Sequence, residues 1–193
     1  MHLFALLTAA LGVAAATVPT CPTTVTRTTT NTVTVTTTTC PASTPTPVPL
    51  YRAYNPTIYD HFYTTNQNEY NNAVQNLGYS AEGIACRLYA TQVSGTVPLF
   101  RTYSQSATDH FYTRSAEERD RAVQSLGYSD EGIAGYVYPQ QQSSVPSLTA
   151  LYRTYNGQIT DHFYTVSAPE RDNAVQSLGY SDEGVAGYVF PPQ

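Results

Sequence analysis

Residues 50–64 read LYRAYNPTIYDHFYT, and the motifs at the two ends of this stretch decide the fold. LYRAYN (50–55) and DHFYT (60–64) are followed by LGY (77–79) and EGIA (82–85). The second copy reads LFRTYS (99–104), DHFYT (109–113), LGY (126–128) and EGIA (131–134). The third copy reads LYRTYN (151–156), DHFYT (161–165), LGY (178–180) and EGVA (183–186). The histidines of successive copies stand 49 and 52 residues apart, so the chain contains an internal repeat of about 50 residues.

Each copy has a readable local structure. The two aromatic motifs have the composition of short strands. Asn66, Ser115 and Ser167 each precede a glutamate by three residues, which is the spacing of a helix N-cap with its capping box. Ala73, Val74 and Leu77 form an apolar stripe, and Gly78 is placed to end the helix. We expect Tyr-x-x-Glu-Gly to make a turn before a closing strand, so the unit is β-β-α-β.

One such unit cannot bury its aromatic face alone. Three copies are too few for an open array with capping units, so we expect a closed, pseudo-threefold body. The predicted fold is mainly β with short inserted helices and resembles a β-trefoil. The alternative is an irregular threefold α+β assembly.

The chain divides into three parts. Residues 1–16 are apolar and end in small residues, which is typical of a signal peptide. Residues 17–47 contain sixteen threonines and form a Thr/Pro-rich stalk of the kind that carries O-linked glycans. Residues 48–193 hold the three copies, at about 49–97, 98–146 and 147–193. We therefore expect a secreted, extracellular protein, associated with a cell wall.

The composition excludes several partners and chemistries. The net charge is −5, which excludes a nucleic-acid partner, because such binding depends on clustered positive charge. All nine basic residues are arginines, so enzymes that need a catalytic lysine amine are excluded as well. Beyond the N-terminus no apolar run is long enough for a transmembrane helix.

The three cysteines have different settings. Cys21 and Cys40 could close a hairpin in the stalk as a disulfide. Cys86 corresponds to Gly135 and Gly187 in the other copies, so we expect it to be a small buried residue and not a catalytic thiol.

The repeat resembles a family of secreted-protein repeats of unknown function, typified by YRxYN, DHFYT and GYxxEGI, that occurs in bacterial and fungal extracellular proteins. The resemblance covers about three quarters of the chain. In bacteria such repeats often accompany cell-wall hydrolases, which implies a surface- or glycan-binding role. This chain has Tyr79, Tyr128 and Tyr180 where the family frequently has tryptophan.

The repeated polar residues suggest a sugar site in each copy. Sugars bind to an aromatic platform flanked by groups that hydrogen-bond to hydroxyls. The candidate carbohydrate-binding residues are Tyr54, Asn55, Asp60, Tyr103, Ser104, Asp109, Tyr155, Asn156 and Asp161. We give a structural or secondary role to Arg52, Arg101, Arg153, His61, His110, His162, Glu82, Glu131 and Glu183.

Other interpretations of the same residues stay open. The arginine and aspartate of each copy could form a salt bridge within that copy, and each histidine could be a ring hydrogen-bonded beneath tyrosines. Three histidines meeting on the threefold axis could bind zinc, although we predict no metal and no cofactor.

The function that these residues favour is non-catalytic carbohydrate binding. A catalytic site needs unlike partners in one cleft, whereas here one Asp-His pair is repeated three times, so we do not expect an enzyme. The alternative is a structural or protein-interaction component of a cell wall, and a more remote one is a wall-acting hydrolase.

Overall fold

The computed structural model describes residues 45–192, and these hold all three copies. The first copy contains β1 (Val48–Asn55), β2 (Asp60–Thr64), α1 (Gln67–Asn76) and β3 (Ser80–Leu88). The second contains β4 (Val97–Ser104), β5 (Asp109–Thr113), α2 (Ala116–Ser125) and β6 (Ser129–Val137). The third contains β7 (Thr149–Asn156), β8 (Asp161–Thr165), α3 (Ala168–Ser177) and β9 (Ser181–Val189). The predicted signal peptide, the stalk up to residue 44 and the Cys21–Cys40 bridge lie outside the described residues.

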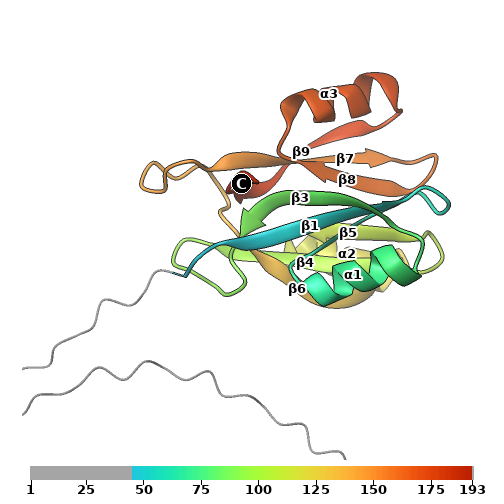
Figure 1. Cartoon of the computed structure of the whole chain (residues 1–193), viewed down its shortest axis with the longest axis horizontal. Helices are drawn as coiled ribbons and strands as arrows, with labels where there is room; N and C mark the ends of the chain where they lie inside the picture. The colour runs from blue at the N-terminus through green and yellow to red at the C-terminus, as the bar shows by residue number, and fades with distance from the viewer. Residues whose placement is uncertain (1–44, 193) are drawn as a thin grey trace, which may run out of the picture. The chain divides into compact units, whose positions relative to one another are not determined.

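The β-β-α-β unit predicted for each copy is confirmed. Each copy forms one three-stranded antiparallel sheet with its first strand in the centre, in the orders β2-β1-β3, β5-β4-β6 and β8-β7-β9. Figure 1 shows the three sheets as successive colour blocks, from blue-green through yellow to red. The hairpin register places Tyr54 opposite His61 and Arg52 opposite Tyr63, and both pairs recur in the other copies.

The Glu-Gly segment is part of a strand, so the turn predicted there is wrong. In the first copy β3 starts at Ser80 and runs through Glu82 and Gly83, with Gly83 opposite Arg52. Gly83 has φ +85°, and the strand register shifts between Leu50 and Tyr51 and again between Arg52 and Ala53. The glycine therefore serves a β-bulge, which lets the chain leave the helix and enter the sheet without a separate turn.

The helices begin where the sequence predicts but pack differently. The Asn66 side chain accepts hydrogen bonds from the backbone N–H groups of Asn68 and Glu69, which confirms it as N-cap. Gly78, with φ +79°, follows the last helical turn, as predicted. Ala73 is the buried residue of α1, whereas Leu77 is 56% exposed, so the predicted apolar stripe is wrong at its last position.

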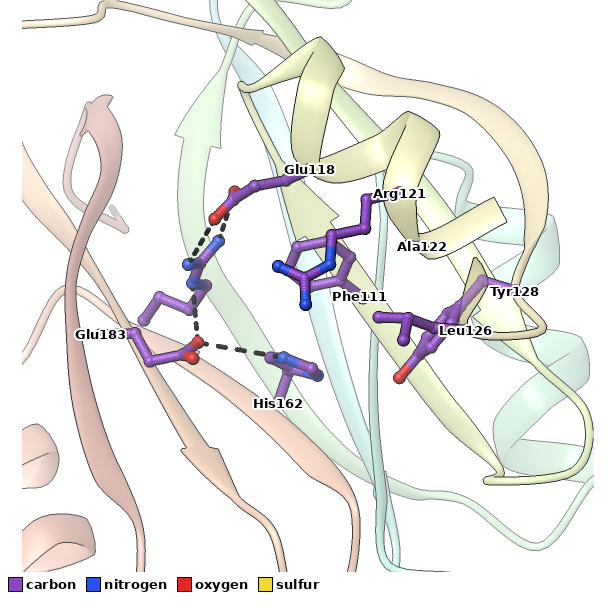
Figure 2. Close-up of a pocket in the computed structure, with 9 residues that line it drawn as sticks. Phe111, Glu118, Arg121, Ala122, Leu126, Tyr128, His162 and Glu183 are labelled. Carbon is purple, nitrogen blue, oxygen red and sulfur yellow. Dashed lines mark hydrogen bonds and ion pairs between the residues drawn. The ribbon is translucent and has the colours of Figure 1, made fainter. Parts of the chain in front are cut away.

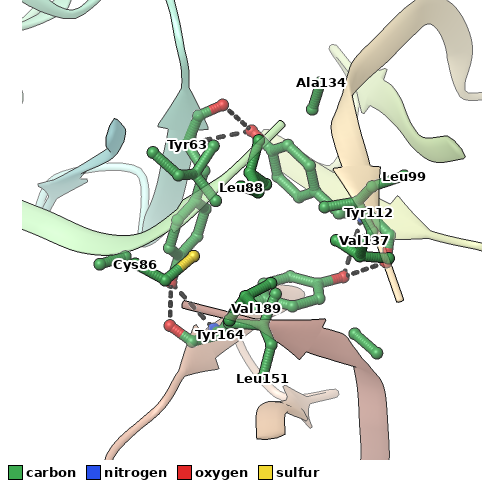
Figure 3. Close-up of a cluster of buried hydrophobic side chains, with 13 residues drawn as sticks. Tyr63, Cys86, Leu88, Leu99, Tyr112, Ala134, Val137, Leu151, Tyr164 and Val189 are labelled. Atoms are coloured by element: carbon green, nitrogen blue, oxygen red, sulfur yellow. Dashed lines mark hydrogen bonds between the residues drawn. The ribbon is translucent and has the colours of Figure 1, made fainter. Parts of the chain in front are cut away.

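Three tyrosines form the centre of the core. The phenol oxygens of Tyr63, Tyr112 and Tyr164 each donate to a backbone carbonyl of another copy and accept from a backbone N–H, at 2.7–2.8 Å. Their ring centroids lie 5.4–5.5 Å apart in edge-to-face contact (Figure 3). Burial raises the pKa of each phenol well above its usual value. The donor and the acceptor of each of these hydrogen bonds come from different copies. Each copy therefore supplies partners for buried polar groups of another copy.

The three sheets also contact one another pairwise along their closing strands. Short backbone bridges join Arg87 to Phe190, Tyr89 to Tyr136 and Tyr138 to Tyr188. Within residues 45–192 these contacts form no closed barrel, so the β-trefoil prediction is not confirmed. The architecture is three similar antiparallel sheets and three short helices around a pseudo-threefold axis.

Cys86 and its glycine counterparts lie where the sheets meet. A Cβ added to Gly135 would stand 2.2 Å from Leu88 Cδ1, and one added to Gly187 would stand 2.6 Å from Val137 Cγ2. Cys86 is fully buried in the same core (Figure 3), and burial raises the pKa of its thiol to about 12. The prediction of a small buried residue is confirmed. Cys86 has no disulfide partner within residues 45–192.

No helix in the described part of the chain is long and apolar enough to cross a membrane.

Candidate binding pockets between the repeats

The three aspartates of the DHFYT motifs lie together on the axis. Asp60 is fully buried, and its Oδ1 accepts a 2.9 Å hydrogen bond from the backbone N–H of His110. Its Oδ2 lies 2.7 Å from His110 Nδ1 and accepts a hydrogen bond from the Tyr79 hydroxyl. The same contacts join Asp109 to His162, and Asp161 to His61, with Tyr128 and Tyr180 as the hydroxyl donors.

This arrangement changes the role that the sequence assigns to the polar residues. Each aspartate pairs with the histidine of the next copy, so the alternative interpretation, a salt bridge between arginine and aspartate inside one copy, is wrong. A carboxylate that is fully buried with both oxygens engaged cannot reach a ligand from solvent. Burial raises the pKa of Tyr79, and the neighbouring Asp60 raises it further, so this phenol stays a proton donor.

Asn55, Ser104 and Asn156 are buried too, and they organise the hairpin loops. Asn55 Nδ2 donates to the Leu77 carbonyl at the end of α1, and its Oδ1 accepts from the backbone N–H of Thr57. Ser104 Oγ accepts from the backbone N–H of Ala107. These contacts tie each loop to its own copy, so direct sugar contacts predicted for these side chains have no support in the geometry.

Each arginine of the first strand bridges two glutamates from different copies. Arg52 donates a fork of 3.0 and 3.1 Å to Glu170 of the third copy. Its Nε lies 2.9 Å from Glu82 Oε2 of its own copy. This contact is an ion pair without the geometry of a hydrogen bond. Arg101 and Arg153 repeat this arrangement. The arginines thus join one copy to another through ion pairs. The structural role expected for them is observed, but their partners are glutamates and not aspartates.

The glutamates of the expected capping boxes, Glu69, Glu118 and Glu170, pair with these arginines. Burial alone would raise the pKa of Glu170, but hydrogen bonds from Arg52 and Thr165 outweigh it, so that the pKa is lowered. For Glu118 the hydrogen bond from Arg153 is the largest influence and lowers the pKa. Burial would also raise the pKa of Glu69, but hydrogen bonds from Arg101 and Thr64 lower it overall. The first backbone N–H groups of each helix are therefore capped by the side chain of Asn66, Ser115 or Ser167 alone. The glutamate of the expected capping box instead binds the arginine of the next copy.

The histidine rings lie in an aromatic stack that crosses the same boundary. His61 packs between Tyr54 of its own copy, with ring centroids 4.3 Å apart, and Phe163 of the third copy, 4.8 Å apart. Its Nδ1 is bound to Asp161, and its Nε2 faces Glu82 Oε2 at 4.0 Å. This agrees with the prediction of a hydrogen-bonded ring against a tyrosine.

The histidines do not form a zinc site. Within residues 45–192 the only three metal-ligand groups with atoms within 4.8 Å of one another are Asp60, Asp109 and Asp161. These carboxylates are already hydrogen-bonded to histidines and tyrosines, as described above.

A pocket opens at each of the three junctions between copies. We call them the 1/2, 2/3 and 3/1 junction pockets, with volumes of about 220, 270 and 210 Å³. The 1/2 junction pocket is lined by Phe62, Glu69, Asn72, Ala73, Leu77, Tyr79 and His110. The 2/3 junction pocket is lined by Phe111, Glu118, Arg121, Ala122, Leu126, Tyr128, Arg153, His162 and Glu183. The 3/1 junction pocket is lined by His61, Glu82, Phe163, Glu170, Asn173, Ala174, Leu178 and Tyr180.

The pockets share one plan. One copy supplies an apolar wall of phenylalanine, leucine and tyrosine from its hairpin and helix, and the next copy supplies a histidine. Figure 2 shows the 2/3 junction pocket, with the Phe111 wall on one side and His162 and Glu183 on the other. The leucine at each rim is 55–56% exposed. An exposed leucine beside a partly buried tyrosine and polar groups is a surface suited to a ligand with both apolar and polar faces.

These pocket walls are not identified from the sequence. The phenylalanines look like strand core, and the leucines look like the buried end of a helical stripe. Only the structure shows that each ten-residue helix buries one alanine and leaves the leucine before the glycine outside the core.

One comparison with known proteins finds a family that covers most of the chain. Residues 49–190 match a family model described as Domain of unknown function (DUF5648). No curated protein and no solved structure shows a significant match to the chain. The family match spans all three copies and most of the chain, so this protein belongs to the DUF5648 family.

Proposed function

We propose that this protein binds carbohydrate without transforming it, and that the three junction pockets are the binding sites. The observation that carries the proposal is that one pocket plan, with an aromatic and aliphatic wall and a helix glutamate from one copy and a histidine from the next, occurs at all three junctions. Sugars present an apolar C–H face and a rim of hydroxyls, which such a pocket matches.

The free polar groups of each pocket suit hydroxyls. In the 3/1 junction pocket the histidine Nδ1 is bound to Asp161, which leaves Nε2 toward the cavity side and Glu82. Asn173 adds a side-chain amide from α3. The volumes lie below the roughly 300–1,000 Å³ that is usual for drug-sized ligands, so each pocket is suited to one sugar unit of a longer chain.

Three sites on one rigid body favour a polymeric ligand. Each shallow pocket alone would bind weakly, but linked sites gain about 10²–10⁴ in avidity when a polymer reaches more than one. A cell-wall or cell-surface polysaccharide is the ligand class that fits this arrangement, and the proposed secretion of the chain places it beside such polymers.

A purely structural role is the second candidate. It is favoured by the arginine, aspartate and histidine contacts, which all join one copy to the next and would serve a scaffold equally well. Substitution of the exposed leucines at the pocket rims separates the two candidates, because it should weaken sugar binding but leave the contacts between copies intact.

The test is retention of the full chain on insoluble chitin, β-glucan, mannan and peptidoglycan, together with a glycan array. We expect retention on at least one polymer. A variant combining Leu77→Gln, Leu126→Gln and Leu178→Gln should lose at least about tenfold in affinity, because each site loses an apolar contact. Ile133→Gln is the matched control, since Ile133 is 49% exposed and lies outside the junction pockets.

Three outcomes would contradict the proposal. Retention on none of these sugars would favour the structural role. Equal loss in the triple variant and the Ile133→Gln control would move the site away from the pockets. Release of soluble sugar from a bound polymer would show that the protein is a hydrolase.

A further inference from the structure

We infer that the 2/3 junction pocket takes an acidic sugar, a unit carrying a carboxylate such as a uronic acid, and that Arg121 selects it. The inference deepens the proposed function and rests on it. It starts from a difference among otherwise equivalent pockets: the sixth residue of the helix is Arg121 in α2 but Asn72 in α1 and Asn173 in α3. All three residues line their junction pockets.

Arg121 is available to a ligand. It is exposed, and among residues 45–192 no protein group forms a hydrogen bond or ion pair with its guanidinium. Figure 2 shows the guanidinium extending from α2 into the pocket beside Phe111. The other arginine of this pocket, Arg153, is engaged by Glu118 and Glu183.

The charge of the pocket follows from these contacts. At every junction two glutamates and one buried aspartate stand against one arginine, which leaves two negative charges in excess before the histidine is counted. Among the residues that line the three pockets, Arg121 reduces this excess by one charge, and it does so only in the 2/3 junction pocket. That pocket is therefore one unit more positive than the other two, and its unengaged charge is the positive one.

The chemistry of a guanidinium points to a carboxylate. Its planar N–H fork matches two carboxylate oxygens, and this pairing is stronger than a hydrogen bond between neutral groups. Glu118 and Glu183 stand nearby and oppose a more highly charged group, which favours a single negative charge. The aromatic wall, with Phe111 and Tyr128, remains for the sugar ring.

The experiment measures affinity of the full chain for polygalacturonate and neutral galactan, with dextran sulfate and dextran as a second acidic and neutral pair. Arg121→Asn, which installs the residue of the other pockets, should lower affinity for polygalacturonate by about tenfold or more and leave galactan unchanged. Asn72→Arg should raise affinity for polygalacturonate. Arg114→Asn is the control with the same loss of charge, because Arg114 does not line the 2/3 junction pocket but a neighbouring cavity, and its guanidinium donates to the Pro139 carbonyl.

The outcomes separate this inference from the proposed function. If glycans bind but Arg121→Asn leaves polygalacturonate affinity unchanged, the inference is overturned and the proposed function stands. If Arg114→Asn and Arg121→Asn weaken polygalacturonate and dextran sulfate equally, general charge attraction explains the binding and the inference is again overturned. Failure of every polymer, neutral and acidic, rejects both. Binding of free galacturonate that depends on Arg121 while every neutral glycan fails would support the acidic site and reject the wider proposal.

Discussion

The hydroxyl of Tyr63 donates a 2.8 Å hydrogen bond to the carbonyl oxygen of Tyr164, although 101 residues separate the two in the chain. Tyr112 and Tyr164 make the corresponding bonds to the next copies, so the three phenols form one cyclic network. Because each bond crosses a repeat boundary, none of them exists in an isolated copy. Stability should therefore be shared among the copies.

Removing the third copy tests this sharing. A chain ending before Leu151 leaves the Tyr63 hydroxyl without its acceptor and opens the core. We expect it to lack a cooperative urea transition and to bind the dye ANS, as a chain with loosened packing does. A cooperative, dye-free two-copy chain would show instead that the copies behave as an open array.

A single hydroxyl of the tyrosine network should carry a measurable share of the stability. Tyr112→Phe leaves the buried backbone N–H and carbonyl of Tyr63 without partners, and each such group costs roughly 1–3 kcal/mol. We expect the free energy of unfolding in urea to fall by about 2–5 kcal/mol. Tyr51→Phe is the control, because Tyr51 stacks on Tyr70 away from the network. If both variants lose the same amount, the network is not the cause.

Alanine at Cys86 and at Gly135 should lower stability in both cases, but the loss at Gly135 should be the larger one. Cys86→Ala removes one buried sulfur and should cost about 1 kcal/mol. Gly135→Ala places a Cβ 2.2 Å from Leu88 Cδ1 and 3.1 Å from the Tyr89 carbonyl, so overpacking should cost about 1–3 kcal/mol or more. Urea unfolding of both variants checks the order. The Cys86 thiol, with its pKa raised to about 12, should react with a thiol reagent only after denaturation. Fast labelling of the native chain would contradict this.

Acid should weaken the contacts between copies. The pKa of Glu69, Glu118 and Glu170 is lowered from 4.5 in the folded chain. A lowered folded pKa gives stability that is present above the unfolded value and lost as pH falls through the folded value. We therefore expect the free energy of unfolding to decline as pH drops below about 4.5.

A matched pair of variants assigns this loss. Glu118→Gln should lower stability at pH 7 and flatten the dependence below pH 4.5, because Arg153 loses its charged partner. Glu117→Gln, one residue away on the exposed face of α2, should keep the steeper profile of the parent. Identical profiles for the two variants would mean that the ion pair is not responsible. These glutamates are more than a third exposed, so solvent screening makes each contribution modest.

The candidate site was predicted only in part. The tyrosines of the first strand and the histidines of the second do lie together, since Tyr54 and His61 are cross-strand partners in every copy's hairpin. The aspartate beside each histidine turns to the axis instead, because neighbouring residues of a strand point to opposite faces. The phenylalanine walls were missed because strand composition alone cannot distinguish a residue in the core from one lining a pocket.

The β-β-α-β unit and its three copies follow from local signals in the sequence. Strand composition, the N-caps at Asn66, Ser115 and Ser167, and Gly78 with its counterparts are local signals, and local geometry alone satisfies them. Which copy supplies each hydrogen-bond or ion-pair partner depends instead on how the three sheets pack together. The three copies carry the same DHFYT motif, so the sequence does not distinguish His61, His110 and His162 as partners of Asp60. The choice of His110 depends on how the sheets pack around the axis, where buried carboxylates and phenols need partners that their own strand cannot place within reach.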